Sequence, residues 1–292
     1  MDPPASLGAS RQVSSCRHGT MVYPRHDQHV GRSLALYGEW AEAEMDLLGL
    51  LIKPGDAVID VGANIGTHTL FFSEKVGPTG RVLACEPQRL AIQMLCANLA
   101  LNHRDNVIAL PVAVGQSSGT VAVPALDYQT PANFGGARLS LADVSGVPTL
   151  AADTEPATLV TLDQLARTHL RPARRRCRLI KIDVEGMERA VLEGGEQLIN
   201  DDEPYLYVEN NDRQRSPLLI EWLEQHDYRL FWHVSRFFNP RNFRQNPDNV
   251  FGALCDLNMI AVRPNLAAAF GSLAPVRGPG DPGPSSVERP DG

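Results

Sequence analysis

The sequence predicts a doubly wound α/β fold, in which helices cover both faces of a mostly parallel sheet. Residues 58–61 and 81–85 read as short buried strands, and each is followed by a stretch that can form a helix. Residues 107–114 form a third apolar run. Two strand–helix repeats followed by a strand give a right-handed parallel sheet, with its ligand crevice at the carboxyl ends of the strands.

The turn after the first strand carries the clearest chemical signal. Residues 60–66 read Asp-Val-Gly-Ala-Asn-Ile-Gly, with an acid before the first glycine. Glycines let a backbone approach a ligand closely, and the helix that follows presents unpaired N–H groups to it. Glu86 directly follows the second strand, where a carboxylate can accept hydrogen bonds from both ribose hydroxyls of an adenosine group.

The acid before the first glycine distinguishes this turn from a dinucleotide-binding turn. Asp60 would repel a pyrophosphate, whereas Asp60 and Glu86 together favour a ligand with positive charge and a ribose. S-adenosylmethionine has a sulfonium, an ammonium and a ribose, so we expect it as the cofactor. Two alternatives remain, namely an NAD-dependent oxidoreductase that uses Glu86 for its ribose, and a non-catalytic scaffold that binds a partner through residues 235–243.

These residues resemble a known family. Residues 60–66 followed by Cys-Glu-Pro at 85–87 are similar to the first two motifs of class I S-adenosylmethionine-dependent methyltransferases. Lys-Ile-Asp-Val-Glu-Gly at 181–186 resembles the FkbM-type branch specifically, and the resemblance covers residues 36–262. It implies a Rossmann-like fold with a mostly parallel seven-stranded sheet and an antiparallel C-terminal strand. It also implies O-methylation of a hydroxyl on a sugar, polyketide or other secondary metabolite.

The motifs and the resemblance together give a predicted cofactor site. Its members are Glu39, Asp60, Gly62, Asn64, Gly66, Thr69 and Glu86. Glu39 is included because residues 38–40 are similar to a Gly-Glu-aromatic stretch near the cofactor in FkbM-like proteins. The alternative for Glu39 is a covering helix over residues 38–48 with a solvated acidic face.

The remaining elements complete the predicted sheet. Helices are expected at 69–76, 90–101, 187–200 and 216–226, and strands at 178–183, 205–210, 228–234 and 257–262, the last two as an antiparallel pair. Residues 115–160 break the strand–helix rhythm and predict β-hairpins or loop. Residues 171–178 hold five arginines without interleaved aromatic residues, so they predict a solvated connection and not a nucleic-acid site.

Three acids follow adjacent predicted strands and are the candidates for catalysis. Asp183, Glu185 and Glu209 should face one crevice, where clustered acids raise one another's pKa and suit a general base for a hydroxyl acceptor. Asp183 has the alternative roles of binding the cofactor's amino group or capping the next helix. His233, at the end of a later strand, is the other candidate base. Acids at a cleft can also hold Mg²⁺, but their spacing differs from that of catechol-type O-methyltransferases, so no metal is predicted.

Length and composition limit the other possibilities. The chain has 292 residues and a net charge of −7, which offers no global attraction to nucleic acid or anionic lipid. It has no apolar run long enough for a membrane span and no signal-peptide pattern in residues 1–20. Five scattered cysteines predict reduced thiols in a cytoplasm. We expect one domain over residues 34–263, between a mobile arm (1–33) and a disordered Pro/Gly-rich tail (264–292).

Overall fold

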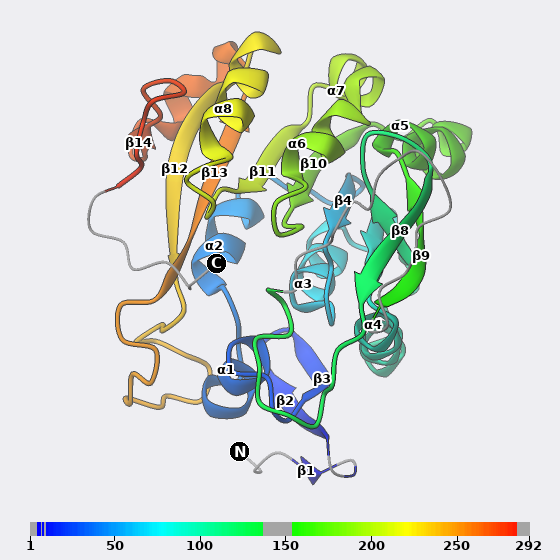
Figure 1. Ribbon diagram of the computed structural model, residues 1–292, viewed down its shortest axis with the longest axis vertical. Helices are drawn as coiled ribbons and strands as arrows, with labels where there is room; N and C mark the ends of the chain where they lie inside the picture. Colours follow the sequence, from blue (N-terminus) through cyan, green and yellow to red (C-terminus); the bar gives the residue numbers. More distant parts are fainter. Residues whose placement is uncertain (1–4, 7, 9, 137–153, 285–292) are drawn as a thin grey trace.

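The main sheet organises the molecule. The computed structural model describes residues 5, 6, 8, 10–136 and 154–284. Within these ranges the main sheet has eight strands in the order β14-β12-β13-β11-β10-β4-β5-β6 (Figure 1). These strands are β4 (Ala57–Val61), β5 (Arg81–Cys85), β6 (Val107–Leu110), β10 (Cys177–Ile182), β11 (Tyr205–Glu209), β12 (Arg229–Arg236), β13 (Cys255–Val262) and β14 (Ala274–Pro275).

The strand directions confirm the predicted fold class. Strands β6, β5, β4, β10 and β11 run parallel, and β13 lies antiparallel between β11 and β12. The two-residue strand β14 extends the sheet beyond the seven strands that the sequence predicts. The chain places β5 and β6 on one side of β4, then crosses to the other side for β10 and β11. This reversal leaves a crevice at the carboxyl ends of the strands, as in other doubly wound sheets.

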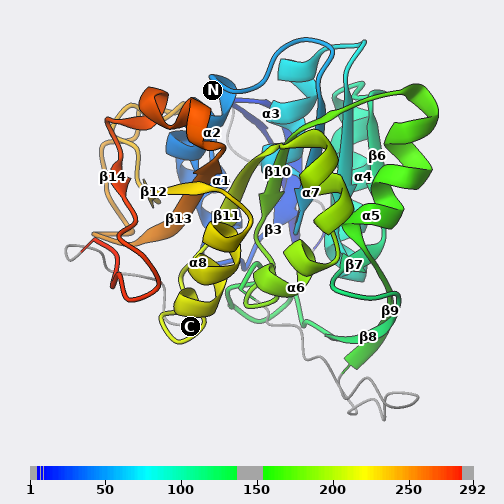
Figure 2. The ribbon, with the colours of Figure 1, turned by 90° about the horizontal axis from the view of Figure 1, so that it is seen from above.

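Helices cover both faces of the sheet because its central strands are apolar on both sides. In β4, Val58 packs in one core with α2 and α3, and Ile59 packs in the opposite core with α6, α7 and α8 (Figure 2). The described helices are α1 (Val30–Tyr37), α2 (Glu42–Gly49), α3 (Thr67–Val76), α4 (Arg89–Leu101), α5 (Leu162–Leu165), the π-helix Ala166–Leu170, the 3₁₀ helix Arg171–Ala173, α6 (Glu188–Glu193), α7 (Glu196–Asp202), α8 (Ser216–Gln225) and the 3₁₀ helix Pro264–Phe270. In the part of the chain with described structure, no helix combines the length and the apolar character needed to cross a bilayer.

The N-terminal segment differs from the mobile arm that its composition predicts. Strands β1 (Ala5–Ser6), β2 (Arg11–Cys16) and β3 (Gly19–Pro24) form an antiparallel sheet that packs against α4. The Asn98 amide of α4 both accepts from the backbone of Val22 and donates to it, at 2.6 and 3.0 Å. Met21 and Tyr23 are buried beside it. The consecutive apolar residues Met21, Val22 and Tyr23 of β3 stand within a segment of polar composition.

The predicted helix at 38–48 begins later than expected, because residues 38–41 form a turn between α1 and α2. Gly38 and Ala41 both have positive φ, so the chain turns between α1 and α2. The long connection between β12 and β13 folds back against this turn, because the backbone N–H of Arg244 donates to the Tyr37 carbonyl at 3.0 Å. Figure 1 shows this connection beside α1, and the Arg244 guanidinium donates to the Ser15 carbonyl of β2 at 3.1 Å, although the two segments are far apart in the sequence.

The expected third strand is split, and the segment after it forms a small separate sheet. Pro111, which has no N–H to donate, separates β6 from β7 (Val112–Val114). β7 pairs with β9 (Thr154–Val160), which pairs antiparallel with β8 (Gly119–Pro124). This agrees with the hairpin expected within residues 115–160, of which 137–153 lie outside the described residues.

The C-terminal segment is also more regular than the predicted disordered tail. Phe270 in the helix Pro264–Phe270 is buried against Phe231, with ring centroids 5.8 Å apart. Strand β14 then pairs with β12. One buried aromatic residue anchors a segment whose Pro, Gly and Ala content favours disorder, while residues 285–292 of the predicted tail lie outside the described range.

Candidate functional site

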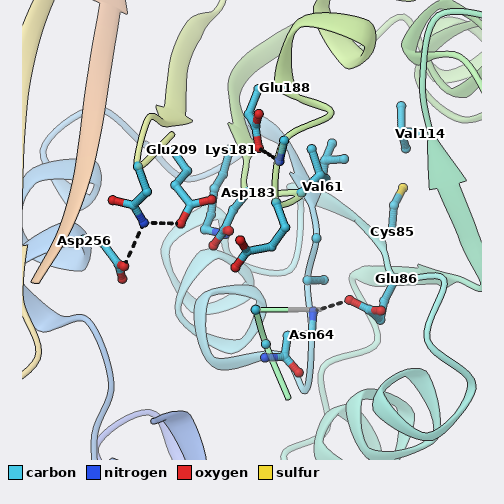
Figure 3. Close-up of a pocket in the computed structure, with 18 of the residues that line it drawn as sticks. Val61, Asn64, Cys85, Glu86, Val114, Lys181, Asp183, Glu188, Glu209 and Asp256 are labelled. Atoms are coloured by element: carbon cyan, nitrogen blue, oxygen red, sulfur yellow. Dashed lines mark hydrogen bonds and ion pairs between the residues drawn. The ribbon is translucent and has the colours of Figure 1, made fainter. Parts of the chain in front are cut away.

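A cavity of about 520 Å³ lies at the carboxyl ends of β4, β5, β10 and β11. One end is formed by the β4 turn and by the residues after β5, among them Glu86. The other end is formed by acids that follow β10 and β11 and by Asp256 near the start of β13 (Figure 3). Trp40 and Phe237, with ring centroids 4.7 Å apart, contribute to the wall on the side of the N-terminal segment.

The glycines of the β4 turn are required by the protein's own packing. Gly62 has a φ of 79°, and a Cβ added to it would overlap the backbone carbonyl of Asp183. Gly66 has a φ of 91°, and a Cβ there would overlap the Leu95 side chain. The sequence predicts these glycines as points of close ligand approach. Gly62 does line the cavity and Gly66 does not, but at both positions a side chain would first meet protein atoms.

The N–H groups of this turn are already used within the protein. Those of Gly62 and Ala63 donate to the Cys85 carbonyl, both at 3.0 Å, and that of Gly66 donates to Ala63. The Asn64 N–H donates to Glu86 at 2.8 Å. The turn therefore presents a ligand with a positioned carboxylate acceptor more than with the free donors that the motif suggests.

Glu86 is held in place by two backbone donors. It is 6% exposed, and its two carboxylate oxygens accept from the N–H groups of Asn64 (2.8 Å) and Gln88 (2.7 Å). Burial raises the pKa of Glu86 to about 7, with Asp60 and Asp183 adding to the rise and the two backbone hydrogen bonds opposing it. Each oxygen keeps a second acceptor site, so the group can still receive hydroxyl donors from a ligand.

Asp60 and Thr69 lie behind the cavity, not on its wall. Asp60 is fully buried, and its Oδ2 accepts from the Thr69 hydroxyl at 2.6 Å. Its Oδ1 is 3.8 Å from the Lys181 ammonium and has no hydrogen-bond partner. Neither Asp60 nor Thr69 lines the cavity. Asp60 would therefore affect a bound ligand only indirectly, through Lys181 and the β4 backbone, because it does not contact the cavity.

Lys181 and Asp183 form an ion pair at the end of β10. Lys181 is buried, and its Nζ lies 2.9 Å from Asp183 Oδ2. Burial alone would raise the pKa of Asp183, but the adjacent Lys181 ammonium brings it below its ordinary value. Burial opposes the charge of Lys181 as well, and Asp183, Asp60 and Glu44 nevertheless raise its pKa. The pair is therefore ionised near neutral pH.

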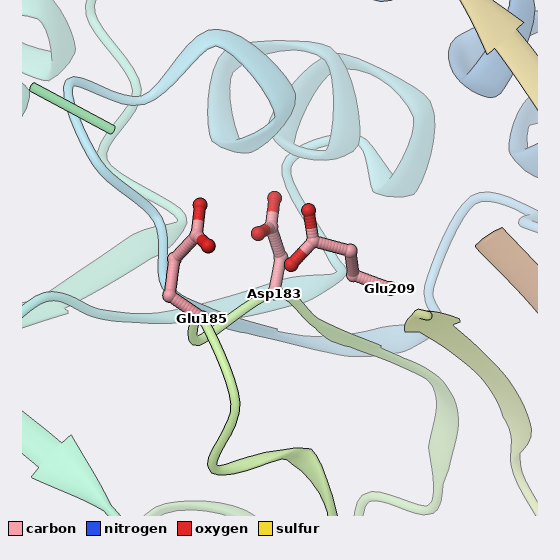
Figure 4. A group of neighbouring side chains, drawn as sticks. All are labelled: Asp183, Glu185 and Glu209. Carbon is pink, nitrogen blue, oxygen red and sulfur yellow. The ribbon is translucent and has the colours of Figure 1, made fainter. Parts of the chain in front are cut away.

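Three carboxyl groups, one of them Asp183, converge at this end of the cavity (Figure 4). Carboxylate oxygens of Asp183, Glu185 and Glu209 lie within 4.8 Å of one another. Burial raises the pKa of Glu209 well above its usual range, and the neighbouring carboxyls Asp183 and Glu185 raise it further. The structure thus brings together the three acids that the sequence predicts to share one crevice.

Asp256 is a fourth acid at this end of the cavity, and the sequence pattern did not predict it. Its pKa is also raised well above its usual range, first by burial and then by Glu44 and Asp183. The Asn211 amide donates to both Glu209 (2.6 Å) and Asp256 (3.2 Å), as the dashed lines in Figure 3 show. Strand β13 runs antiparallel to β11, so its first residues lie beside the last residues of β11. The predicted strand began at residue 257, one residue too late to include Asp256.

Glu44 and His68 were also missed as cavity residues. Glu44 Oε2 lies 3.0 Å from His68 Nε2, and Glu44 Oε1 accepts from the Asn258 amide at 3.1 Å. Burial raises the pKa of Glu44, but the contact with His68 outweighs it and the net shift is downward. A signal was present for Glu44, because it shares a helix face with Leu48, which is fully buried. His68 lay within the recognised motif without an assigned role.

Two further predicted site residues, Glu39 and His233, also lie outside the cavity lining. Glu39 accepts hydrogen bonds from Arg17 (2.8 Å), Asn239 (2.7 Å) and the Phe243 N–H (2.6 Å), and so joins the N-terminal hairpin to the β12–β13 connection. The ring nitrogen Nδ1 of His233 is 2.7 Å from the Tyr207 hydroxyl, and burial lowers its pKa. Both positions fit a structural role, and their predicted functional roles remain predictions.

Comparison with known proteins places this geometry in context. Over 70 residues the chain is 34% identical to ribosomal RNA large subunit methyltransferase E of Lawsonia intracellularis, and over 65 residues it is 38% identical to the methyltransferase sdnD of Sordaria araneosa. These alignments cover 24% and 22% of this chain, and 32% and 25% of the two relatives. The chain therefore spans about a third or less of the length of the curated relatives it matches.

Two solved structures resemble a larger share of the chain at lower sequence identity. The methyltransferase FkbM of Methylobacillus flagellatus has a TM-score of 0.45 and 16% identity, over 74% of this chain and 50% of that one. Fibrillarin of Aeropyrum pernix, solved with natively bound S-adenosyl-L-methionine, has a TM-score of 0.45 and 14% identity, over 89% and 99%. The Methyltransferase FkbM domain family matches residues 60–230, which is more than half of the chain. The protein therefore belongs to the FkbM methyltransferase family.

Proposed function

We propose that the protein transfers the methyl group of S-adenosylmethionine to a hydroxyl group of a small acceptor, such as a sugar or polyketide. One observation supports this most strongly. A single cavity holds a carboxylate suited to a ribose at one end, Glu86, and a carboxyl pair suited to proton transfer at the other, Asp183 and Glu209. Membership of the FkbM family makes methyl transfer the expected chemistry.

The Glu86 end of the cavity fits an adenosine group. The side chains of Val61, Cys85, Ala91 and Val114 line this end and offer apolar surface for an adenine ring. Beside them, Glu86 offers acceptor positions on both carboxylate oxygens for ribose hydroxyls. The bound cofactor would supply an electrophilic methyl group on a sulfonium. The acid-rich lining suits a ligand that carries positive charge.

The charges around the cavity favour an acceptor without phosphate. Among the lining residues that the structure describes, three are lysine or arginine and nine are acidic. Each cation lies near a carboxylate, since Lys181 is 2.9 Å from Asp183, Arg189 is 2.8 Å from Glu193, and Arg215 is 3.5 Å from Asp212. A nucleic-acid backbone needs cations that it can pair with. This pattern therefore supports a neutral or cationic hydroxylated acceptor over RNA.

A carboxylate is the preferred general base in this proposal. Methyl transfer to a hydroxyl releases a proton, and a base within hydrogen-bond reach speeds the step. Asp183, Glu185 and Glu209 line the cavity together, whereas His233 lies outside the lining and contacts Tyr207. We therefore assign the base to the carboxyl group cluster, with His233 as the rival.

Titration calorimetry with S-adenosylmethionine, S-adenosylhomocysteine and NAD tests the cofactor. We expect binding of the first two and none of NAD, and the reverse result would make the protein an oxidoreductase.

Transfer of labelled methyl groups to a panel of glycans, polyketides and ribosomal RNA then tests the acceptor. Labelling of RNA alone would overturn the acceptor class. The same assays with a chelator test the prediction that no metal takes part. If the enzyme requires a divalent metal, the chelator will abolish methyl transfer.

A further inference from the structure

Lys181 is a buried cation that the proposed function does not yet use. In the strand register it stands opposite Asp60 of β4 and Tyr207 of β11. Its side chain is 3% exposed, and its Nζ lies 2.9 Å from Asp183 and 3.8 Å from Asp60. A buried ammonium is tolerated only where nearby carboxylates compensate it. Lys181 is therefore fixed beside Asp183, with little room for another partner.

Asp183 and Glu209 place carboxylate oxygens within 4.8 Å of each other, beside the Lys181 ammonium. At this separation two ionised carboxylates repel each other, and this repulsion favours a proton on one of them. Neighbouring carboxyls that interact this strongly titrate as one unit, because like charges prevent both from ionising together. The pair thus retains one proton, and its surroundings decide which residue carries it.

The surroundings of the two carboxyls have opposite effects. Asp183 faces the Lys181 ammonium, which favours its ionised form. Glu209 is 8% exposed, and the neighbouring acids Glu185 and Asp256 both favour its protonated form. The hydrogen bond that Glu209 receives from Asn211, at 2.6 Å, comes from a neutral amide. The pair is therefore asymmetric even though both members are carboxylic acids.

We propose that Lys181 is a positioning residue whose ammonium holds Asp183 as the carboxylate that meets the acceptor and leaves the shared proton on Glu209. The catalytic consequence rests on the proposed function. As the acceptor oxygen bonds to the methyl carbon, the carbon–sulfur bond breaks with its electron pair on sulfur. The hydroxyl proton passes to Asp183, so the number of protons and electrons is conserved without another reactant.

The other titratable groups around Lys181 do not oppose this arrangement. Glu44 of α2 already contacts His68 of α3 at 3.0 Å. Asp60 of β4 is farther from the ammonium than Asp183 is. Tyr207 of β11 hydrogen-bonds His233, and burial raises the pKa of its hydroxyl well above the ordinary value, so it stays neutral. Asp183 is thus the nearest carboxylate to Lys181 and the one that faces the cavity.

Carbon NMR of protein labelled at the aspartate and glutamate carboxyls tests where the proton lies. This measurement needs neither cofactor nor acceptor, so it is independent of the proposed function. Loss of one signal in Asp183→Asn and of another in Glu209→Gln assigns the two resonances. In the wild-type protein near neutral pH we expect an ionised Asp183 and a protonated Glu209. The opposite assignment, or two ionised carboxyls, would overturn the proposal.

The variant Lys181→Met removes the charge and keeps most of the side-chain length. We expect the Asp183 titration midpoint to rise by about one to three pH units, because an opposite charge at this distance lowers a carboxyl pKa by that amount. Lys53→Met is the matched control, since Lys53 is exposed and far along the chain from the pair. An unchanged Asp183 midpoint in folded Lys181→Met protein would contradict the role of Lys181. Should Lys181→Met fail to fold, the wild-type assignment alone decides where the proton lies.

Kinetics give a second readout once an acceptor is found. In Lys181→Met the acidic limb of the kcat profile should move to higher pH, while cofactor affinity at neutral pH stays within about threefold of wild type. A merely structural lysine would lower kcat by the same factor at every pH. If no acceptor is methylated but the NMR result holds, the proposed function is wrong and the placement of the proton stands.

Discussion

The two ends of the cavity hold acids in different ways. At one end, Glu86 is held by the N–H groups of Asn64 and Gln88, two nearby stretches of backbone. At the other end, Lys181 holds Asp183 and Asn211 holds Glu209, and these residues come from different strands and connections. Backbone donors fix the position of one carboxylate for ribose binding, whereas side chains from separate elements set the relative pKa values of several carboxyl groups.

The difference has a chemical consequence. Burial raises the pKa of Glu86 to about 7, so its charge changes near neutral pH. The pKa of Asp183 lies below its ordinary value despite burial, because Lys181 is adjacent. The first carboxylate can therefore make ligand binding sensitive to pH, whereas the second remains ionised as a proton acceptor. Substitutions at the two ends should separate binding from turnover.

The largest effect is expected from Asp183→Asn. If Asp183 accepts the hydroxyl proton, its amide should lower kcat by about 10²–10⁴-fold, the usual contribution of a general base. Cofactor affinity should change little, because removing a group that acts only in the transition state lowers the rate without weakening ground-state binding of the cofactor. Rates and calorimetry on Asp183→Asn, Glu185→Gln and Glu209→Gln check this. Near-wild-type turnover in all three would remove the carboxyl cluster from the chemistry.

Gly62→Val should mainly affect stability. The added side chain would overlap the Asp183 carbonyl and occupy a positive φ that β-branched residues avoid, so we expect a loss of about 3 kcal/mol or more. Chemical denaturation measures this loss. Gly119→Val is the control, because a Cβ at Gly119 meets nothing within 4 Å. A stable Gly62→Val protein would contradict this expectation, because it would mean that the turns after β4 and β10 can move apart.

The fold was largely predictable because its signals are local. Short apolar runs, the glycine turn and the two strand–helix repeats each lie within a few residues, and the sheet order follows from them. The N-terminal hairpin was not predictable in this way. It is anchored by the Asn98 amide of α4, which pairs with the Val22 backbone, and by the buried Tyr23, contacts between segments far apart in the sequence. Tertiary contacts there outweigh a composition that favours disorder.

The site follows the same division. Glu86 was predictable because it directly follows a strand that comes after a recognisable turn. Asp256 was not, because its place depends on the antiparallel register of β13 beside β11. The position of Glu39 shows the limit of a resemblance, since its three hydrogen-bond partners come from segments whose packing the sequence does not reveal. Only the assembled structure separates residues that line the cavity from those behind it.

Glu86→Gln should weaken cofactor binding more than it affects the fold. Losing a charge-assisted hydrogen bond to the ribose should cost about 1.5–3 kcal/mol of binding free energy. Calorimetry with S-adenosylhomocysteine measures this, and the unfolding transition of the same protein shows whether the backbone turn survives. Unchanged affinity would remove Glu86 from the cofactor site.

The pH dependence of Glu86 gives a smaller effect with a definite sign. A ribose hydroxyl donates best to the ionised carboxylate, so cofactor affinity should rise by about tenfold between roughly pH 6 and pH 8 as Glu86 ionises. The stability of the cofactor-free protein should change in the opposite direction. Between pH 4.5, the ordinary pKa of a glutamate, and about pH 7 the unfolded chain ionises before the folded one, so stability falls by about 3 kcal/mol over this window. Glu86→Gln should flatten both trends.

His233→Asn should have the smallest effect and is the sharpest test of whether a carboxylate or the histidine is the general base. The ring lies outside the cavity lining and contacts the Tyr207 hydroxyl at 2.7 Å, and burial keeps its pKa below the ordinary value. Asparagine keeps a hydrogen-bonding group, so we expect turnover within about threefold of wild type and a stability loss of about 1 kcal/mol. Initial rates over a range of pH, compared with Asp183→Asn under the same conditions, measure this. Loss of turnover in His233→Asn with activity retained in the three amide variants would make the histidine the base. The asymmetric carboxyl pair would then have a structural role, and the acceptor would have to approach from the β12 side of the sheet.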